Sequence, residues 1–236
     1  MSVYEAVFFD IDDTLYSTTE FTKKARYNAI DEMIRMGLAI DRKECFDVLN
    51  EIINEFSSDD DRHLNKLLHR IPDEAKQNIN ELITVAAGVS GYHNTKFVDL
   101  KPFPDVETYL PEIAALPLKL GVISSGIGIK QAEKLVRLDL HRFFDNNLIF
   151  ISDETGIGKN NPAIFKTACR KAAVDSSQAV HVGDNPATDI DKAHEAGLTT
   201  VLREGSGKHA HDASRFEPDF RIKSFEELYG ILKNHQ

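Results

Sequence analysis

The sequence has few cysteines, fewer basic than acidic residues and no long hydrophobic run. Its two cysteines, Cys45 and Cys169, are far apart and each falls within a helical pattern, so we expect two separate buried thiols and a reducing compartment. The 28 lysines and arginines against 38 aspartates and glutamates give a net charge of −10 at pH 7. This balance argues against non-specific binding to nucleic acid or to an anionic membrane, because both require a basic surface.

No apolar run approaches the roughly 20 residues that a membrane-spanning helix needs. The N-terminus also shows no basic segment followed by an apolar one, as a secretory signal would. We therefore expect a cytoplasmic protein. The 236 residues, 42% of them hydrophobic and 28% charged, are enough for one or two globular domains with a sizeable core.

The most informative stretch is an apolar run that ends in carboxylates. Val3 and residues 6–9 are too few for a helix and predict a strand buried on both faces. Asp10, Asp12 and Asp13 follow it, at the end of the strand where ligands bind in open α/β sheets. Crowded carboxylates repel one another unless a cation such as Mg²⁺ lies between them. The alternative interpretation is an acidic turn that caps a helix.

Between residues 20 and 92 the pattern is helical and contains no convincing strand. It predicts four helices, the first ending at Gly37 and the last opening at Pro72. The apolar residues of this fourth helix are Ile79, Leu82, Ile83 and Ala86. We interpret the block as a helical lobe inserted after the first strand, with residues 97–104 as the return linker.

From residue 104 onward, short apolar strands alternate with helical segments. The predicted strands cover residues 118–123, 148–151, 179–182 and 199–202. Alternation of this kind implies right-handed crossovers and predicts an α/β fold with a doubly wound parallel sheet.

Reactive side chains follow several of these strands. Asp10, Ser124 and Asp184 stand at strand ends, and Lys159 lies in the loop after the strand at residues 148–151. Because the carboxyl ends of parallel strands share one edge of the sheet, we expect the four side chains to meet there. Carboxylates for a cation, with a lysine and a hydroxyl for phosphoryl oxygens, suit the handling of a phosphoryl group.

Four motifs in order resemble those of the haloacid dehalogenase superfamily of aspartyl-phosphate phosphatases. Residues 10–14 (DIDDT) resemble its DxDxT motif, and residues 122–124 (VIS) resemble the apolar run that ends in Ser or Thr. Lys159 resembles the third motif, and residues 183–189 (GDNPATD) resemble GDxxxxD. The resemblance covers the whole chain and implies a Rossmann-like core of residues 1–17 and 98–236, with a small α-helical cap of residues 18–97.

The resemblance also implies roles for the acidic residues. Asp10 would be the nucleophile that forms an aspartyl-phosphate. Asp12 would protonate the leaving group and then activate water. Mg²⁺ would bind the carboxylates of Asp10 and Asp184 and the backbone carbonyl of Asp12, while Asp189 would support the metal through water or through Lys159. Superfamily dehalogenases lack an acid/base carboxylate at the position of Asp12, which favours phosphoryl transfer.

The same comparison suggests which residues contact the substrate. Ser124 and Lys159 would hold the transferring phosphoryl group, and Ser125 would lie beside it. His93 and Lys96, where the cap rejoins the core, are candidates for the non-phosphate end of the substrate, although a solvated or hinge role is an equal alternative. We assign no role to His209 and His211.

A narrower resemblance points to the archaeal glyceraldehyde-3-phosphate phosphatase-like branch, carried by residues 8–15, 29–37 and 92–97. We expect a Mg²⁺-dependent phosphatase acting on a small phosphorylated metabolite, because a cap excludes bulky ligands. A nucleoside-monophosphate phosphatase and a phosphosugar mutase are alternative enzymes. A receiver-like phospho-accepting signalling protein is the non-enzyme alternative. The sequence leaves the oligomeric state and any opening of the cap undetermined.

Overall fold

A computed structural model of the chain describes residues 3–57, 60–205 and 207–235. The chain divides into two compact units, of which one contains the residues up to Thr19 together with those from Lys101 onward. We call this the core unit. The second, Glu20–Leu100, is the helical insertion after the first strand, and we call it the cap unit. Within the described residues, no helix combines the length and the apolar character needed to cross a membrane.

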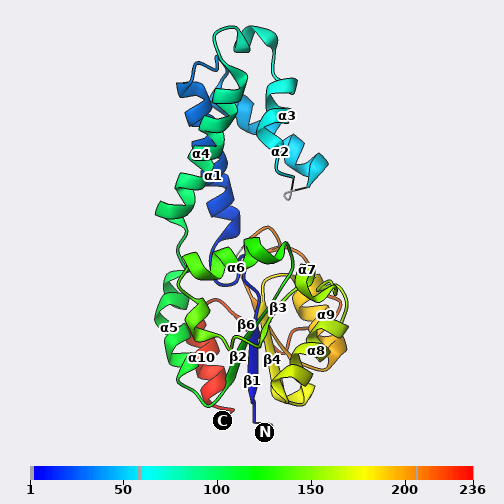
Figure 1. Ribbon diagram of the computed structural model, residues 1–236. Helices are drawn as coiled ribbons and strands as arrows, with labels where there is room; N and C mark the ends of the chain where they lie inside the picture. Colours follow the sequence, from blue (N-terminus) through cyan, green and yellow to red (C-terminus); the bar gives the residue numbers. More distant parts are fainter. Residues whose placement is uncertain (1–2, 58–59, 206, 236) are drawn as a thin grey trace. The chain divides into compact units, whose positions relative to one another are not determined.

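The core unit is built on a six-stranded sheet in which every pair of neighbouring strands is parallel. The strands are β1 (Ala6–Phe9), β2 (Lys119–Ser124), β3 (Ile149–Ile151), β4 (Ala179–Gly183), β5 (Thr199–Arg203) and β6 (Phe220–Ile222). Their spatial order is β3-β2-β1-β4-β5-β6, with the first strand near the middle (Figure 1). The prediction of a doubly wound parallel α/β fold is confirmed.

Helices cover both faces of this sheet. They are α5 (Pro104–Ala114), α6 (Gly128–Arg137), α7 (Ser152–Thr155), α8 (Ala163–Ala172), α9 (Asp191–Ala196) and α10 (Phe225–Lys233). In Figure 1, α5 and α10 lie on one side of the strands and α8 and α9 on the other. Successive side chains of β1 pack on opposite faces of the sheet, because side chains alternate in direction along a strand. Phe9 stacks on Phe225 of α10, with 5.7 Å between ring centroids, while Phe8 meets Phe150 in the cluster beneath α8.

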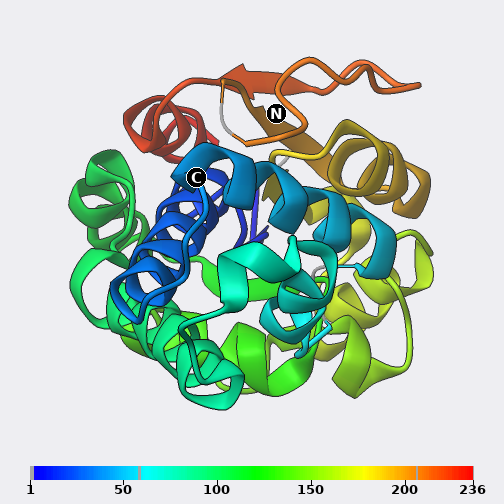
Figure 2. The same cartoon turned by 90° about the horizontal axis from the view of Figure 1, so that it is seen from above.

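The structure corrects the predicted start of the first strand and adds one strand. β1 begins at Ala6, and Val3 lies outside it with half of its surface exposed. The three-residue strand β6, drawn in orange-red at the edge of the sheet in Figure 2, was not predicted.

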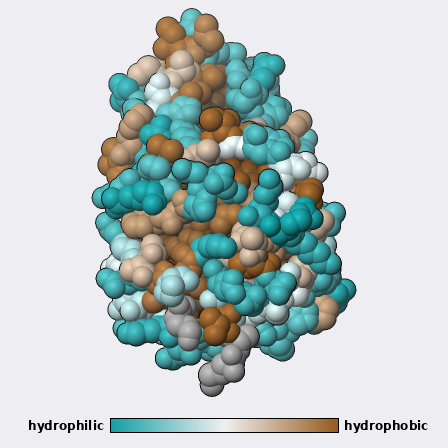
Figure 3. Space-filling model, turned by 60° about the horizontal axis from the view of Figure 1, so that its bottom comes forward, coloured by the Kyte–Doolittle hydropathy of each residue, from teal (hydrophilic) through white to brown (hydrophobic). Residues whose placement is uncertain are grey.

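On the face shown in Figure 3, hydrophilic side chains surround smaller hydrophobic areas, as expected for a chain with many charged residues.

The cap unit contains four α-helices among its described residues: α1 (Thr18–Arg35, which begins in the core unit), α2 (Arg42–Phe56), α3 (His63–Arg70) and α4 (Glu81–Asp99). Asp41 and Asn80 cap α2 and α4 by accepting hydrogen bonds from backbone N–H groups of the first turn. The unit has its own hydrophobic core, formed by Ile30, Met33, Leu38, Cys45, Leu49, Ile52, Leu67, Leu68 and Ile71.

The predicted fourth helix was wrong in its start, and its apolar residues do not form its buried face. Pro72 precedes a short 3₁₀ turn (Asp73–Lys76), and α4 begins only after the Asn80 cap. Leu82 and Ile83, two of the apolar residues on which that prediction rested, are 78% and 59% exposed.

The buried face of α4 is made of small residues instead, namely Thr84, Gly88, Gly91 and Thr95. A Cβ atom at Gly91 would lie 2.8 Å from the carbonyl oxygen of Asn28 on α1, so the two helices approach more closely than larger side chains would allow. The Asn28 amide also donates to the Thr95 hydroxyl at 2.9 Å. The buried face of α4 is therefore determined by close backbone packing against α1 and not by the apolar character of its side chains.

Candidate active site

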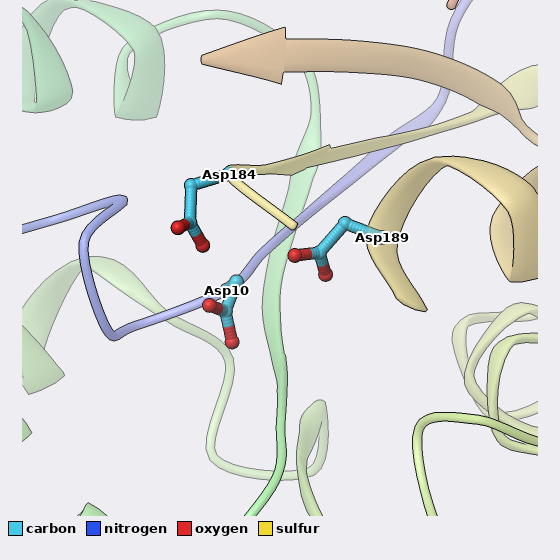
Figure 4. Close-up of side chains that lie close together, drawn as sticks. All are labelled: Asp10, Asp184 and Asp189. Carbon is cyan, nitrogen blue, oxygen red and sulfur yellow. The ribbon is translucent and has the colours of Figure 1, made fainter. Parts of the chain in front are cut away.

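Three buried carboxylates meet at the carboxyl edge of the sheet. Asp10 follows β1, Asp184 follows the neighbouring strand β4, and Asp189 lies in the π-helical turn Pro186–Ile190. One oxygen from each lies within 4.8 Å of those of the other two, and the three side chains lie close together in Figure 4. The parallel pairing of β1 with β4 brings these distant segments together, as predicted for Asp10 and Asp184.

Asp189 is fixed by hydrogen bonds from two directions. The ring Nε2 of His181, on β4, lies 2.8 Å from its Oδ1, and the backbone N–H of Asn185 donates to its Oδ2 at 3.0 Å. Gly183 makes room for it, since a Cβ atom at that position would clash with the Asp189 side chain. The glycine of the GDNPATD stretch is therefore required, because the Asp189 side chain approaches its Cα atom too closely for a residue with a Cβ atom.

Lys159 connects two of the carboxylates. Its Nζ lies 2.6 Å from Oδ1 of Asp10 and 2.7 Å from Oδ1 of Asp189, and its side chain is 4% exposed. Although burial alone would lower the pKa of this lysine, the charges of the two aspartates raise it above its usual range. Burial would likewise raise the pKa of Asp189, but Lys159 and His181 hold it well below its ordinary value. Lys159 and Asp189 thus form a fixed ion pair.

The remaining negative charge is not fully compensated. Burial, followed by the charges of Asp189 and Asp10, raises the pKa of Asp184 from 3.8 to about 8. Burial also raises the pKa of Asp10 to about 7, against the opposing effect of Lys159. One ammonium cannot balance three carboxylates, and carboxylate oxygens are the ligands that hard divalent cations prefer. The donor set therefore fits a divalent metal ion.

Asp12 lies in a different environment, and its carboxylate is held by side chains. Its Oδ1 accepts hydrogen bonds from the hydroxyls of Tyr16 at 2.7 Å and Thr18 at 2.5 Å, and from Lys134 Nζ at 2.6 Å. Its Oδ2 accepts from Lys134 at 2.7 Å and from Gln131 at 3.0 Å. Burial would raise the pKa of Asp12, but Lys134, Thr18 and Gln131 lower it below 3.8.

The other predicted site residues are placed as follows. Ser124 ends β2 and is buried, whereas Ser125 is exposed and its carbonyl oxygen accepts from Gln131 at 2.7 Å. His93 and Lys96 lie on α4 in the cap unit, and their predicted contact with the substrate stays a prediction.

Some polar residues near the site were missed by the sequence reasoning. His181 was overlooked because a histidine in a buried strand looks like part of the core, and the i, i+3 pair Gln131 and Lys134 looks like an ordinary polar helix face. His209, flagged without a role, donates from Nδ1 to Asp212 at 2.6 Å and accepts at Nε2 from Asn185 at 3.0 Å. It therefore ties the loop after β5 to the turn that carries Asp189.

The family model for haloacid dehalogenase-like hydrolases matches residues 7–202. A glyceraldehyde 3-phosphate phosphatase from Methanopyrus kandleri is 41% identical over 234 residues, covering 97% of each chain. One from Methanocaldococcus jannaschii is 37% identical, covering 98% of this chain and 97% of its own. A putative hydrolase of the superfamily from Bacillus subtilis, solved with bound magnesium, has a TM-score of 0.64 at 18% identity and covers 98% of this chain and 99% of its own.

The chain therefore belongs to the haloacid dehalogenase-like hydrolases. Within that superfamily it is a phosphatase, similar over nearly its whole length to archaeal glyceraldehyde 3-phosphate phosphatases. These matches confirm the predicted superfamily, the predicted enzyme class and the narrower resemblance.

Proposed function

We propose that this protein hydrolyses glyceraldehyde 3-phosphate, or a closely similar small phosphate monoester, with Mg²⁺ as its cofactor. The observation that carries the proposal is the buried cluster of Asp10, Asp184 and Asp189 with Lys159 across two of them. Identity of 41% over 97% of the chain to a phosphatase of that name supports the substrate.

The carboxylates of Asp10 and Asp184 and the backbone carbonyl of Asp12 would hold the Mg²⁺ ion, with Asp189 supporting it. When bound, the ion would offset the negative charge of the carboxylates and of the phosphoryl oxygens. Hydroxyl and ammonium groups of Ser124 and Lys159 would hold those oxygens.

In the first half of the reaction, a carboxylate oxygen of Asp10 attacks phosphorus, and the bond from phosphorus to the substrate oxygen breaks. Asp12, which regains a proton from water in the second half of each turnover, gives that proton to the departing oxygen. In the second half, a water molecule attacks phosphorus and passes its proton to the Asp12 carboxylate. The bond between phosphorus and Asp10 then breaks, which releases inorganic phosphate and restores both aspartates.

The test is phosphate release in the presence of Mg²⁺ from triose phosphates, hexose phosphates, nucleoside monophosphates and p-nitrophenyl phosphate. We expect the highest kcat/KM with glyceraldehyde 3-phosphate, and no release in EDTA or with Asp10→Asn. Glu107→Gln, which changes an exposed carboxylate on α5, is the matched control and should behave as wild type.

Other outcomes would contradict the proposal in distinct ways. A preference for nucleotides would identify a nucleotidase, and isomerisation without phosphate release would identify a phosphosugar mutase. A persistent phosphoprotein after treatment with a small phosphodonor would favour the receiver-like alternative.

A further inference from the structure

Two residues on one face of α6 are directed at Asp12. Gln131 and Lys134 are three positions apart, so they are neighbours on the helix surface. Lys134 Nζ lies 2.6 Å from Oδ1 of Asp12 and 2.7 Å from its Oδ2. Among the described contacts of Asp12, this is the donor that reaches both oxygens. The ion pair is largely shielded, since the two side chains are 23% and 29% exposed.

The orientation of the Gln131 amide follows from its neighbours. Its Nε2 lies 3.0 Å from Oδ2 of Asp12 and 2.7 Å from the carbonyl oxygen of Ser125. The Ser125 carbonyl oxygen and the ionised Asp12 carboxylate can only accept, so the NH₂ group must face them. Gln131 thereby links Asp12 to the loop that follows Ser124, and α6 orients both segments.

The donors around Asp12 differ in whether they can also accept a hydrogen bond. The hydroxyls of Tyr16 and Thr18 can either donate or accept, whereas an ammonium group only donates. When Asp12 carries a proton, a hydroxyl can turn and accept it while Lys134 keeps its place. The other site lysine, Lys159, is occupied with Asp10 and Asp189.

We propose that Lys134 is a positioning residue, which holds the Asp12 carboxyl group in the orientation from which it exchanges a proton with the reacting oxygens. This inference rests on the proposed acid/base role of Asp12. In each half of the reaction one O–H bond of Asp12 breaks or forms, and Lys134 keeps all of its protons. Lys134 therefore acts through Asp12 and does not touch the substrate.

The leaving group provides a readout that a merely structural lysine would not move. An alkoxide needs a proton as it departs, while p-nitrophenolate is stable without one. A misoriented Asp12 should therefore slow hydrolysis of alkyl phosphates and spare p-nitrophenyl phosphate. The ratio of kcat/KM for the two substrates measures this effect, because kcat/KM reports steps up to the first irreversible one.

The experiment compares wild type, Asp12→Asn, Lys134→Met, Lys134→Arg and the control Lys171→Met, which lies exposed on α8. The alkyl substrate is glyceraldehyde 3-phosphate, or the best alkyl monoester of the panel above. We expect Lys134→Met to lower its kcat/KM by about 10- to 100-fold, as a small misplacement of a reacting group does. The value for p-nitrophenyl phosphate should change much less, and Lys134→Arg should recover part of the loss.

Each outcome has a defined meaning. If Asp12→Asn lowers kcat/KM for both substrates equally, the acid role of Asp12 fails and this inference fails with it. If Asp12→Asn lowers kcat/KM selectively for the alkyl substrate, but Lys134→Met lowers kcat/KM for both substrates equally or for neither, only the role of Lys134 is refuted. Thermal unfolding of each variant identifies loss of fold, and Lys134→Arg, which keeps a cation, then decides the question by the same ratio.

Discussion

Replacing Asp184 with asparagine should make the metal-free protein more stable while removing its response to Mg²⁺. The side chain is buried and its pKa is raised from 3.8 to about 8. Each pH unit between the ordinary pKa and the working pH costs about 1.4 kcal/mol, so at pH 7 this carboxyl group costs the folded state about 4 kcal/mol. Asparagine carries no such cost and its NH₂ group can donate to neighbouring carboxylates, so we expect a gain of about 2–4 kcal/mol.

The sign of the pH dependence follows from the same shift. The folded wild type binds the Asp184 proton more tightly than the unfolded chain does. The stability that this proton contributes to the wild type is therefore fully present below pH 3.8 and is lost as the pH rises toward 8. Because Asp184→Asn lacks this group, the difference between the two proteins should be near zero at about pH 4 and grow up to about pH 8.

The assay is urea unfolding in EDTA at several pH values, repeated with Mg²⁺. A ligand at 100 times its Kd stabilises a protein by about 2.7 kcal/mol, so wild type should gain stability with Mg²⁺ and Asp184→Asn should gain much less. Glu107→Gln controls for the loss of one carboxylate elsewhere in the core unit. A variant that is less stable than wild type in EDTA, or a difference that does not change with pH, would refute the reasoning.

Three further changes probe the same structure. Lys159→Met should cost about 3–5 kcal/mol in metal-free buffer, because it leaves Asp10 and Asp189 buried without their partner; unchanged urea unfolding would contradict this. Gly183→Ala should cost about 1–3 kcal/mol and weaken stabilisation by Mg²⁺, because the added methyl group displaces Asp189; a wild-type Mg²⁺ titration would count against it. Burial raises the pKa of Cys169 and raises that of Cys45 to about 12, so both thiols should react with a disulfide reagent only as fast as their own unit opens, and immediate labelling would disprove their burial.

The position of the site was accessible from sequence because it depends on local patterns. A short apolar run predicts a strand, and the next residue then lies at the carboxyl edge of a parallel sheet. Asp10, Ser124 and Asp184 follow from that rule without knowledge of any long-range contact. The order of strands in space needed more information, and β6 escaped because three residues carry too little pattern.

What the sequence did not reveal depends on contacts between distant elements. The buried face of α4 is set by the close approach of α1 at Gly91, and this interface favours small residues over the apolar stripe that periodicity identifies. In the same way, Lys134 is separated from Asp12 by 122 positions, and no local feature distinguishes it from the other lysines of the chain.

The two lysines at the site form ion pairs with different carboxylates. Lys159 binds Asp10 and Asp189, so its charge lies beside the carboxylate that we propose as the nucleophile. Lys134 binds Asp12 and partly offsets the repulsion between that carboxylate and Asp10, whose pKa the charge of Asp12 helps to raise. Asp184 has no comparable ion pair among the described residues, and its pKa is raised the furthest of the four aspartates. At pH 7 the folded state therefore keeps a proton on Asp184, and a divalent cation that displaced this proton would give the carboxylate the positive partner that it lacks.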